Sequence, residues 1–145
     1  MTPICAQDTG LVPSGYIVES EDLEGDINLV NLDFGTFAGV DGDGDSVTVD
    51  SMVARSKEVQ AIGSLGFARL VLDAQKEGKD IIPAELRGKV YIILPRTILV
   101  HRDGFRCAAF LIWHSERWVV LVSWLGTRFN RNVRFVRSCE LRSAA

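Results

Sequence analysis

Residues 89–125 carry the clearest pattern of hydrophobic and polar positions in the chain. Their apolar runs are short, rich in β-branched and aromatic residues, and separated by turn-forming residues at positions 103–104 and 115–116. Runs of this kind are typical of β-strands joined by tight turns. We therefore predict a mainly antiparallel sheet, within a β core that spans residues 88–138.

The two turns also predict how the strands pair. A two-residue turn at 103–104 would place Val100 opposite Cys107, and one at 115–116 would place Trp113 opposite Trp118. Alternation along the strands then leaves both faces of the sheet apolar at its centre. The sheet is thus expected to be covered on both sides, or to curl into a small SH3-like barrel.

A second pattern lies between residues 51 and 77, where apolar positions recur at helical spacing. Asp50 or Ser51 can cap the start of a helix here, and Gly78 is a typical residue at its end. We predict one long helix over about 51–77, packed on the sheet. Gly63 and Gly66 fall on its apolar face and favour a close approach to the sheet or a kink.

The first 50 residues show only weak strand character and are rich in acidic residues. We interpret residues 1–145 as a single α+β domain with an acidic β-rich lobe (1–50), a helix (51–78) and a curved antiparallel β core (88–138). A long helix on a curved sheet is the predicted architecture, with a small barrel in the C-terminal half as its variant.

The net charge of −3 conceals a marked split along the chain. Residues 1–82 contain 15 acidic and 5 basic residues, whereas residues 83–145 contain 4 acidic and 11 basic residues, ten of them arginine. Such asymmetry indicates a nucleic-acid or acidic partner, or two halves that face each other and neutralise one another.

Arginines interleaved with phenylalanine are the candidate binding residues of the C-terminal half. Arginine suits both phosphate contact with base stacking and bidentate capture of carboxylates. The candidate partner-binding residues are Arg106, Arg117, Arg128, Phe129, Arg131, Arg134 and Arg137.

A second candidate is the acidic segment of residues 41–45, in which Asp41, Asp43 and Asp45 alternate with glycine. Three acids at this spacing resemble the opening of an EF-hand calcium loop. The sixth position should be glycine and is Ser46, and the twelfth should be glutamate and is Met52. A hairpin turn, a calcium site of another type and an acidic surface for a basic partner remain as interpretations.

No catalytic or metal-binding motif is recognisable, and we predict neither a metal nor a cofactor. His101 and His114 fall at opposite hairpin ends, where each is expected to be a rim residue. The three cysteines are odd in number and widely spaced, which favours a reducing compartment, and Cys107 is expected to be buried. We found no signal-peptide pattern and no long uncharged apolar run, so a cytoplasmic protein without a membrane segment is predicted.

A resemblance to a known family lies in residues 87–95 (RGKVYIILP) and 104–113 (GFRCAAFLIW). This segment resembles the opening of MazF-type ribonuclease toxins, in which a G-x-V strand precedes an R-x-A-x-x-L strand. The resemblance would imply a small barrel with ribonuclease activity. The acidic N-terminal half has no counterpart in that family and the C-terminal helix is missing, so no catalytic residue is carried over.

Three hypotheses for function follow from these observations. The first is a small non-enzymatic binding or regulatory protein whose Arg-rich C-terminal surface engages nucleic acid or an acidic protein. The second is a protein inhibitor or nucleic-acid mimic, of the phage or mobile-element type, that acts through the acidic half. The third is a small ribonuclease-like enzyme that uses histidine and arginine at the rim of the sheet.

Overall fold

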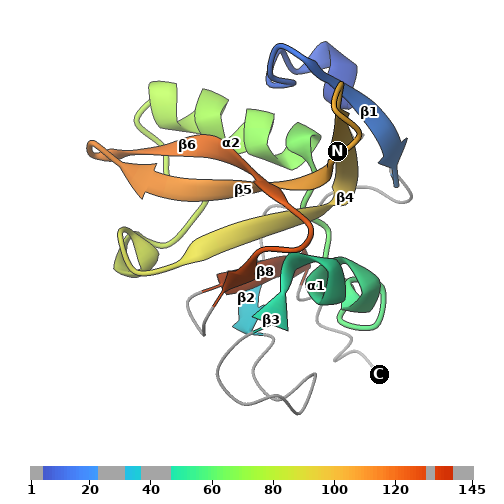
Figure 1. Ribbon diagram of the computed structural model, residues 1–145. Coiled ribbons are helices and arrows are strands. Elements are labelled where there is room, and N and C mark those ends of the chain that lie inside the picture. Colours follow the sequence, from blue (N-terminus) through green and yellow to red (C-terminus); the bar gives the residue numbers. More distant parts are fainter. Residues whose placement is uncertain (1–4, 23–31, 37–46, 130–132, 139–145) are drawn as a thin grey trace.

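The computed structural model describes residues 5–22, 32–36, 47–129 and 133–138 (Figure 1). The helical elements are the 3-10 turns η1 (Ala6–Asp8) and η2 (Ala84–Leu86) and the helices α1 (Val49–Arg55) and α2 (Leu65–Lys76). The strands are β1 (Tyr16–Glu21), β2 (Leu32–Thr36), β3 (Val47–Thr48), β4 (Tyr91–His101), β5 (Arg106–His114), β6 (Arg117–Trp124), β7 (Arg128–Phe129) and β8 (Val133–Ser138).

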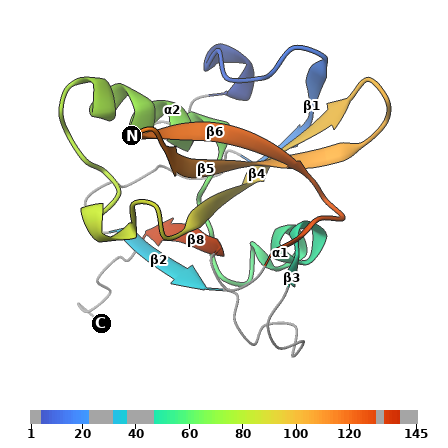
Figure 2. The ribbon, with the colours of Figure 1, turned by 60° about the vertical axis from the view of Figure 1, so that its left-hand side comes forward.

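Strand β4 is the centre of a six-stranded, mainly antiparallel sheet. The strand order is β2-β8-β4-β5-β6, and β1 pairs with the far end of β4. The first residues of β4 pair with β8 in parallel, and its last residues pair with β1 in the antiparallel sense. Both β1 and β2 come from the acidic first 50 residues, and β2 lies beside β8 at one end of the sheet (Figure 2).

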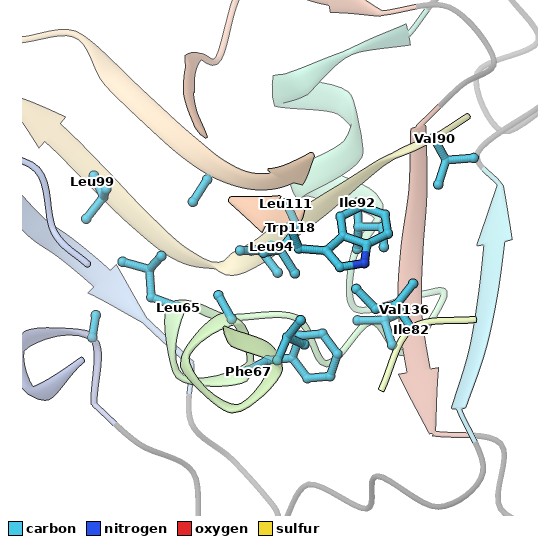
Figure 3. Close-up of a cluster of buried hydrophobic side chains, with 14 residues drawn as sticks. Leu65, Phe67, Ile82, Val90, Ile92, Leu94, Leu99, Leu111, Trp118 and Val136 are labelled. Carbon is cyan, nitrogen blue, oxygen red and sulfur yellow. The ribbon is translucent and has the colours of Figure 1, made fainter. Parts of the chain in front are cut away.

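Each face of the sheet carries its own hydrophobic core. Helix α2 packs on one face, where Phe67, Leu94 and Trp118 are among the buried residues (Figure 3). On the other face, α1 and the small β3–β7 pair accompany a second cluster that includes Met52 and Phe110. The prediction that both faces are apolar and covered is therefore confirmed.

A kink in the middle of β4 connects the two hydrophobic cores. Leu94 is opposite Ala109 of β5 and Ile98 is opposite Ala108, so residues 95–97 have no counterpart on β5. Pro95 lacks the N–H group that a ladder would need, which suits it to such an interruption.

The backbone and side chains freed by this kink bind other parts of the chain. The Arg96 N–H donates to the carbonyl of Gly63 at 2.9 Å. The buried Thr97 hydroxyl accepts from the N–H of Leu65 at 3.1 Å and donates to Glu21 Oε2 at 3.3 Å. One threonine side chain thus ties the start of α2 to the end of β1.

The prediction of one long helix over 51–77 is wrong, because residues 56–64 separate two helices. Ser64 begins α2 with a side chain that accepts from the N–H of Phe67 at 3.2 Å. A β-carbon on Gly63 would lie 3.0 Å from the Ile93 carbonyl oxygen, so the chain passes against β4 here. Gln60 adopts a positive φ of 59°, which a helix does not tolerate.

The predicted barrel is also not formed, since β2 and β6 stay at opposite ends of an open sheet. Helices on both faces cover the apolar surface that closure would otherwise have buried. The α+β class and the mainly antiparallel sheet are confirmed.

Of the two predicted hairpins, the second has the expected register and the first does not. Trp113 is opposite Trp118, as a two-residue turn at 115–116 requires. In the first hairpin the His101 N–H donates to the Phe105 carbonyl, so the loop has three residues and Val100 faces Arg106 instead of Cys107. Gly104, with φ 93°, allows this longer loop.

We expect Thr97→Val to lower the free energy of unfolding by about 1–3 kcal/mol, because the buried N–H of Leu65 and the carboxylate of Glu21 would each lose a partner. Thr97→Ser keeps the hydroxyl and should cost clearly less. Urea unfolding of both variants measures the difference. Equal losses in the two variants would show that the hydroxyl contributes little.

Candidate functional site

Two of the predicted binding arginines are engaged with carboxylates of the acidic half. Arg106 Nε lies 2.6 Å from Glu19 Oε1, and Arg137 Nε lies 2.8 Å from Asp33 Oδ2. All four side chains keep between 35% and 53% of their surface exposed. The interpretation in which the two halves of the chain neutralise each other therefore holds for these residues.

Strand pairing explains why these partners meet. Arg106 and Glu19 project from β5 and β1, the neighbours of β4 on either side. Asp33 is directly opposite Arg137 in the β2–β8 pair. Arg134, on the same strand, donates from Nη1 to the Phe34 carbonyl at 3.1 Å, so it too is bound to β2.

The other predicted residues are distributed over the molecule. Arg117 is exposed next to the β5–β6 turn, and Arg128 is exposed on β7 at the opposite end of β6. Phe129 is half-buried and packs against Phe110, with ring centroids 5.0 Å apart. Phe129 thus belongs to the second core, where it is poorly placed to stack on a base.

The acidic segment with Asp41, Asp43 and Asp45 lies outside the described residues, as does Arg131. The interpretations of that segment therefore stay predictions. Within the described ranges, no group of three or more His, Cys, Asp or Glu side chains is placed to hold a metal ion.

Sequence patterns missed one feature, an exposed aromatic pair at the end of β6. Phe105 and Trp124 are each 54% exposed and contact each other edge to face, with centroids 6.1 Å apart. Alternation along the strands places both on a face of the sheet that is expected to be covered, but they lie where β5 begins and β6 ends. Gly126 could have signalled this, because its missing β-carbon leaves room for the Trp124 ring.

Two of the predicted arginines are near this aromatic pair along the backbone. Arg106 follows Phe105 directly, and its carbonyl accepts from the N–H of Leu125, next to Trp124. Arg128 is exposed three residues further on. We call Phe105, Arg106, Trp124 and Arg128 the aromatic end of β6, although alternation directs the Arg106 side chain to the other face of the sheet from the two rings.

The histidines and thiols show no catalytic arrangement within the described residues. His101 contacts Tyr16 and Asp103 at one end of β5, and His114 is exposed at the other end. A nine-residue strand separates them by about 30 Å. Cys107 is buried, and this burial raises the pKa of its thiol above the ordinary value, although a hydrogen bond with Tyr16 opposes the rise.

A hollow of about 960 Å³ lies between the end of β1, the region after α1 and the β4 kink. Glu21, Asp22, Lys57 and Arg96 bring charges of both signs to its wall. Glu21 is already bound to the Ala6 N–H at 2.8 Å. The hollow could take a small polar ligand, but the described residues of its lining include no histidine or cysteine.

Comparisons of the chain with models of protein families, with curated proteins and with solved structures found no match. The resemblance to MazF-type toxins stays a prediction from the sequence. No helix in the described part of the chain is long and apolar enough to cross a membrane.

We expect Glu19→Gln and Asp33→Asn each to change the free energy of unfolding by less than about 1 kcal/mol, because half-exposed ion pairs are screened by solvent. Thermal or urea unfolding measures this. A loss of several kcal/mol would mean that these pairs hold β1 or β2 on the sheet.

Proposed function

We propose that this protein is a non-enzymatic binding or regulatory protein whose Arg-rich C-terminal half engages an acidic protein partner. The observation that supports this most is that Arg106 and Arg137 each already bind a carboxylate from another part of the chain. Guanidinium groups suit carboxylates in bidentate geometry. Because the two pairs are half-exposed, carboxylates of a partner can compete for the same arginines.

The aromatic end of β6 is the proposed contact surface. Trp124 and Phe105 offer exposed apolar area on one face of this sheet edge, Arg106 projects from the other face of the same edge, and Arg128 follows on β7. Tryptophan and arginine are the residues that most often dominate binding energy at protein interfaces. A partner with an apolar side chain flanked by carboxylates would match this surface.

Nucleic acid is the less favoured partner, because phosphate binding relies on several cations that follow a backbone. Here Arg117 is at the far end of β6 from Arg128, and Arg134 donates to the backbone of β2. The inhibitor hypothesis keeps Glu19 and Asp33 on the same terms, since these acids are half-exposed in the same two ion pairs, and its segment 41–45 lies outside the described residues. The enzyme hypothesis finds no support in the separated histidines.

The proposal predicts salt-dependent binding to an acidic polypeptide. Poly-L-glutamate, titrated at two salt concentrations, should bind more tightly at low salt, and Arg106→Ala should weaken it about tenfold, which corresponds to about 1.4 kcal/mol. Arg55→Ala is the matched control, because Arg55 is also a half-exposed arginine in an ion pair but lies on α1. The proposal fails if a single-stranded RNA of equal charge binds more tightly, or if both variants behave alike.

A second prediction concerns the internal carboxylate. Glu19→Gln frees Arg106 and should raise the affinity for poly-L-glutamate more than Glu58→Gln does, by about threefold. Glu58→Gln makes the same change in net charge and removes the partner of Arg55. Equal effects would attribute the gain to overall charge alone.

A further inference from the structure

Strand β6 is an open edge of the main sheet. It is last in the strand order, and within the described residues only β5 pairs with it. Residues 119–123 contain no charged residue and no proline, and their pairing with β5 shows no bulge. Edge strands ordinarily carry charged residues, prolines or bulges, which prevent pairing with other chains. The β6 edge is thus suited to the addition of another strand.

The β5–β6 turn determines which backbone groups of β6 face this open side. His114 and Arg117 flank the two-residue turn and pair across it. Because hydrogen bonding alternates along an antiparallel pair, every second residue of β6 directs its N–H and C=O away from β5. These residues are Trp118, Val120, Val122 and Trp124.

Both ends of the open side are closed from within the chain. The side-chain amide of Gln75, on α2, imitates a strand: it accepts from the Trp118 N–H at 2.7 Å and donates to the Trp118 carbonyl at 3.2 Å. At the other end, the Thr127 N–H donates to the Trp124 carbonyl at 3.0 Å. Between these points, no group in the described ranges bonds to the outward N–H and C=O of Val120 and Val122.

We propose that this edge pairs with the same edge of a second copy of the chain, antiparallel and with a two-fold axis at Leu121. In this register Val120 of each copy is opposite Val122 of the other. The outward N–H and C=O groups of these valines then form four hydrogen bonds between the two copies. Leu121, which is 41% exposed, meets Leu121 of the second copy. The two sheets become one continuous sheet.

The symmetry of the open groups favours a second copy over an unrelated peptide. The two valines lie at equal distances from Leu121, so the same two residues of each copy form all the hydrogen bonds of the pair. The closures at Trp118 and Trp124 restrict pairing to about residues 119–123 and so select this register. Isologous two-fold dimers are also the commonest protein assemblies. The pairing goes beyond the proposed binding function, because it uses backbone groups of β6 and none of the arginines.

Cross-linking tests the register directly. Leu121 is the non-hydrogen-bonded pair on the axis, where Cα atoms lie about 4.5 Å apart, within the range that a disulfide spans. In a Cys5→Ser, Cys139→Ser background, Leu121→Cys should form a covalent dimer under mild oxidation. Ser123→Cys is the control, because Ser123 lies on the same face but opposite Val119 of the second copy. No cross-link at Leu121, or equal cross-linking at both positions, would overturn the proposal.

Sedimentation of the unmodified chain across a range of concentrations tests the dimer itself. We expect a dimer that Leu121→Lys weakens at least tenfold, since two charges would face each other on the axis. Ile17→Lys, which changes a residue that is 67% exposed on β1, should leave the dimer unchanged. A chain that is monomeric at every concentration, or a dimer that Ile17→Lys weakens equally, would contradict the proposal. Circular dichroism confirms that both variants are folded.

Discussion

The kink of β4 at residues 95–97 is the constraint on which the rest of the structure depends. A straight eleven-residue strand would offer one uniform edge, whereas the kinked strand offers two. Its first part accepts β8 in parallel, and its last part accepts β1 in the antiparallel sense. The same kink turns the Thr97 hydroxyl toward Leu65 and Glu21, so that helix α2 and strand β1 are positioned by one buried side chain.

This arrangement explains how part of the charge split of the sequence is neutralised within the described residues. Strands β1 and β2 carry acids, and the sheet places them next to β4 and β8, close to the arginines of the C-terminal half. Arg106 and Arg137 find their carboxylates through strand pairing, with little contribution to stability expected from exposed pairs. Arg117, next to the β5–β6 turn, is exposed at the other end of β5 from β1.

The sequence predicted those parts of the fold that depend on local chemistry. The α+β class, the antiparallel strands and the pairing of Trp113 with Trp118 followed from alternation and a two-residue turn. The first hairpin was shifted by one residue, because Gly104 allows a three-residue loop as readily as a two-residue turn. The prediction of one continuous helix was wrong. Apolar residues keep a helical spacing through a segment in which Gly63 lies against β4 and Ser64 caps the start of α2, so contacts with the rest of the fold interrupt the helix.

The candidate site was harder to predict than the fold, for a related reason. Periodicity assigns a side chain to a face of a strand but does not say where the covering layer stops. Phe105 and Trp124 have the pattern of core residues and are exposed because they lie at the ends of their strands. Strand pairing between distant segments cannot be read from local patterns either, so the partners of Arg106 and Arg137 were not foreseeable.

The two proposals meet at β6, and geometry sets how they are related. In a pair centred on Leu121, Trp124 of one copy lies near Trp118 of the other, so each aromatic end faces the β5–β6 turn of the second copy. Arg117, exposed next to that turn, would then come close to the aromatic end from which it is far within one chain. Self-pairing would thereby gather arginines that the single chain keeps apart, and an acidic partner would find more cations on the dimer than on either copy alone.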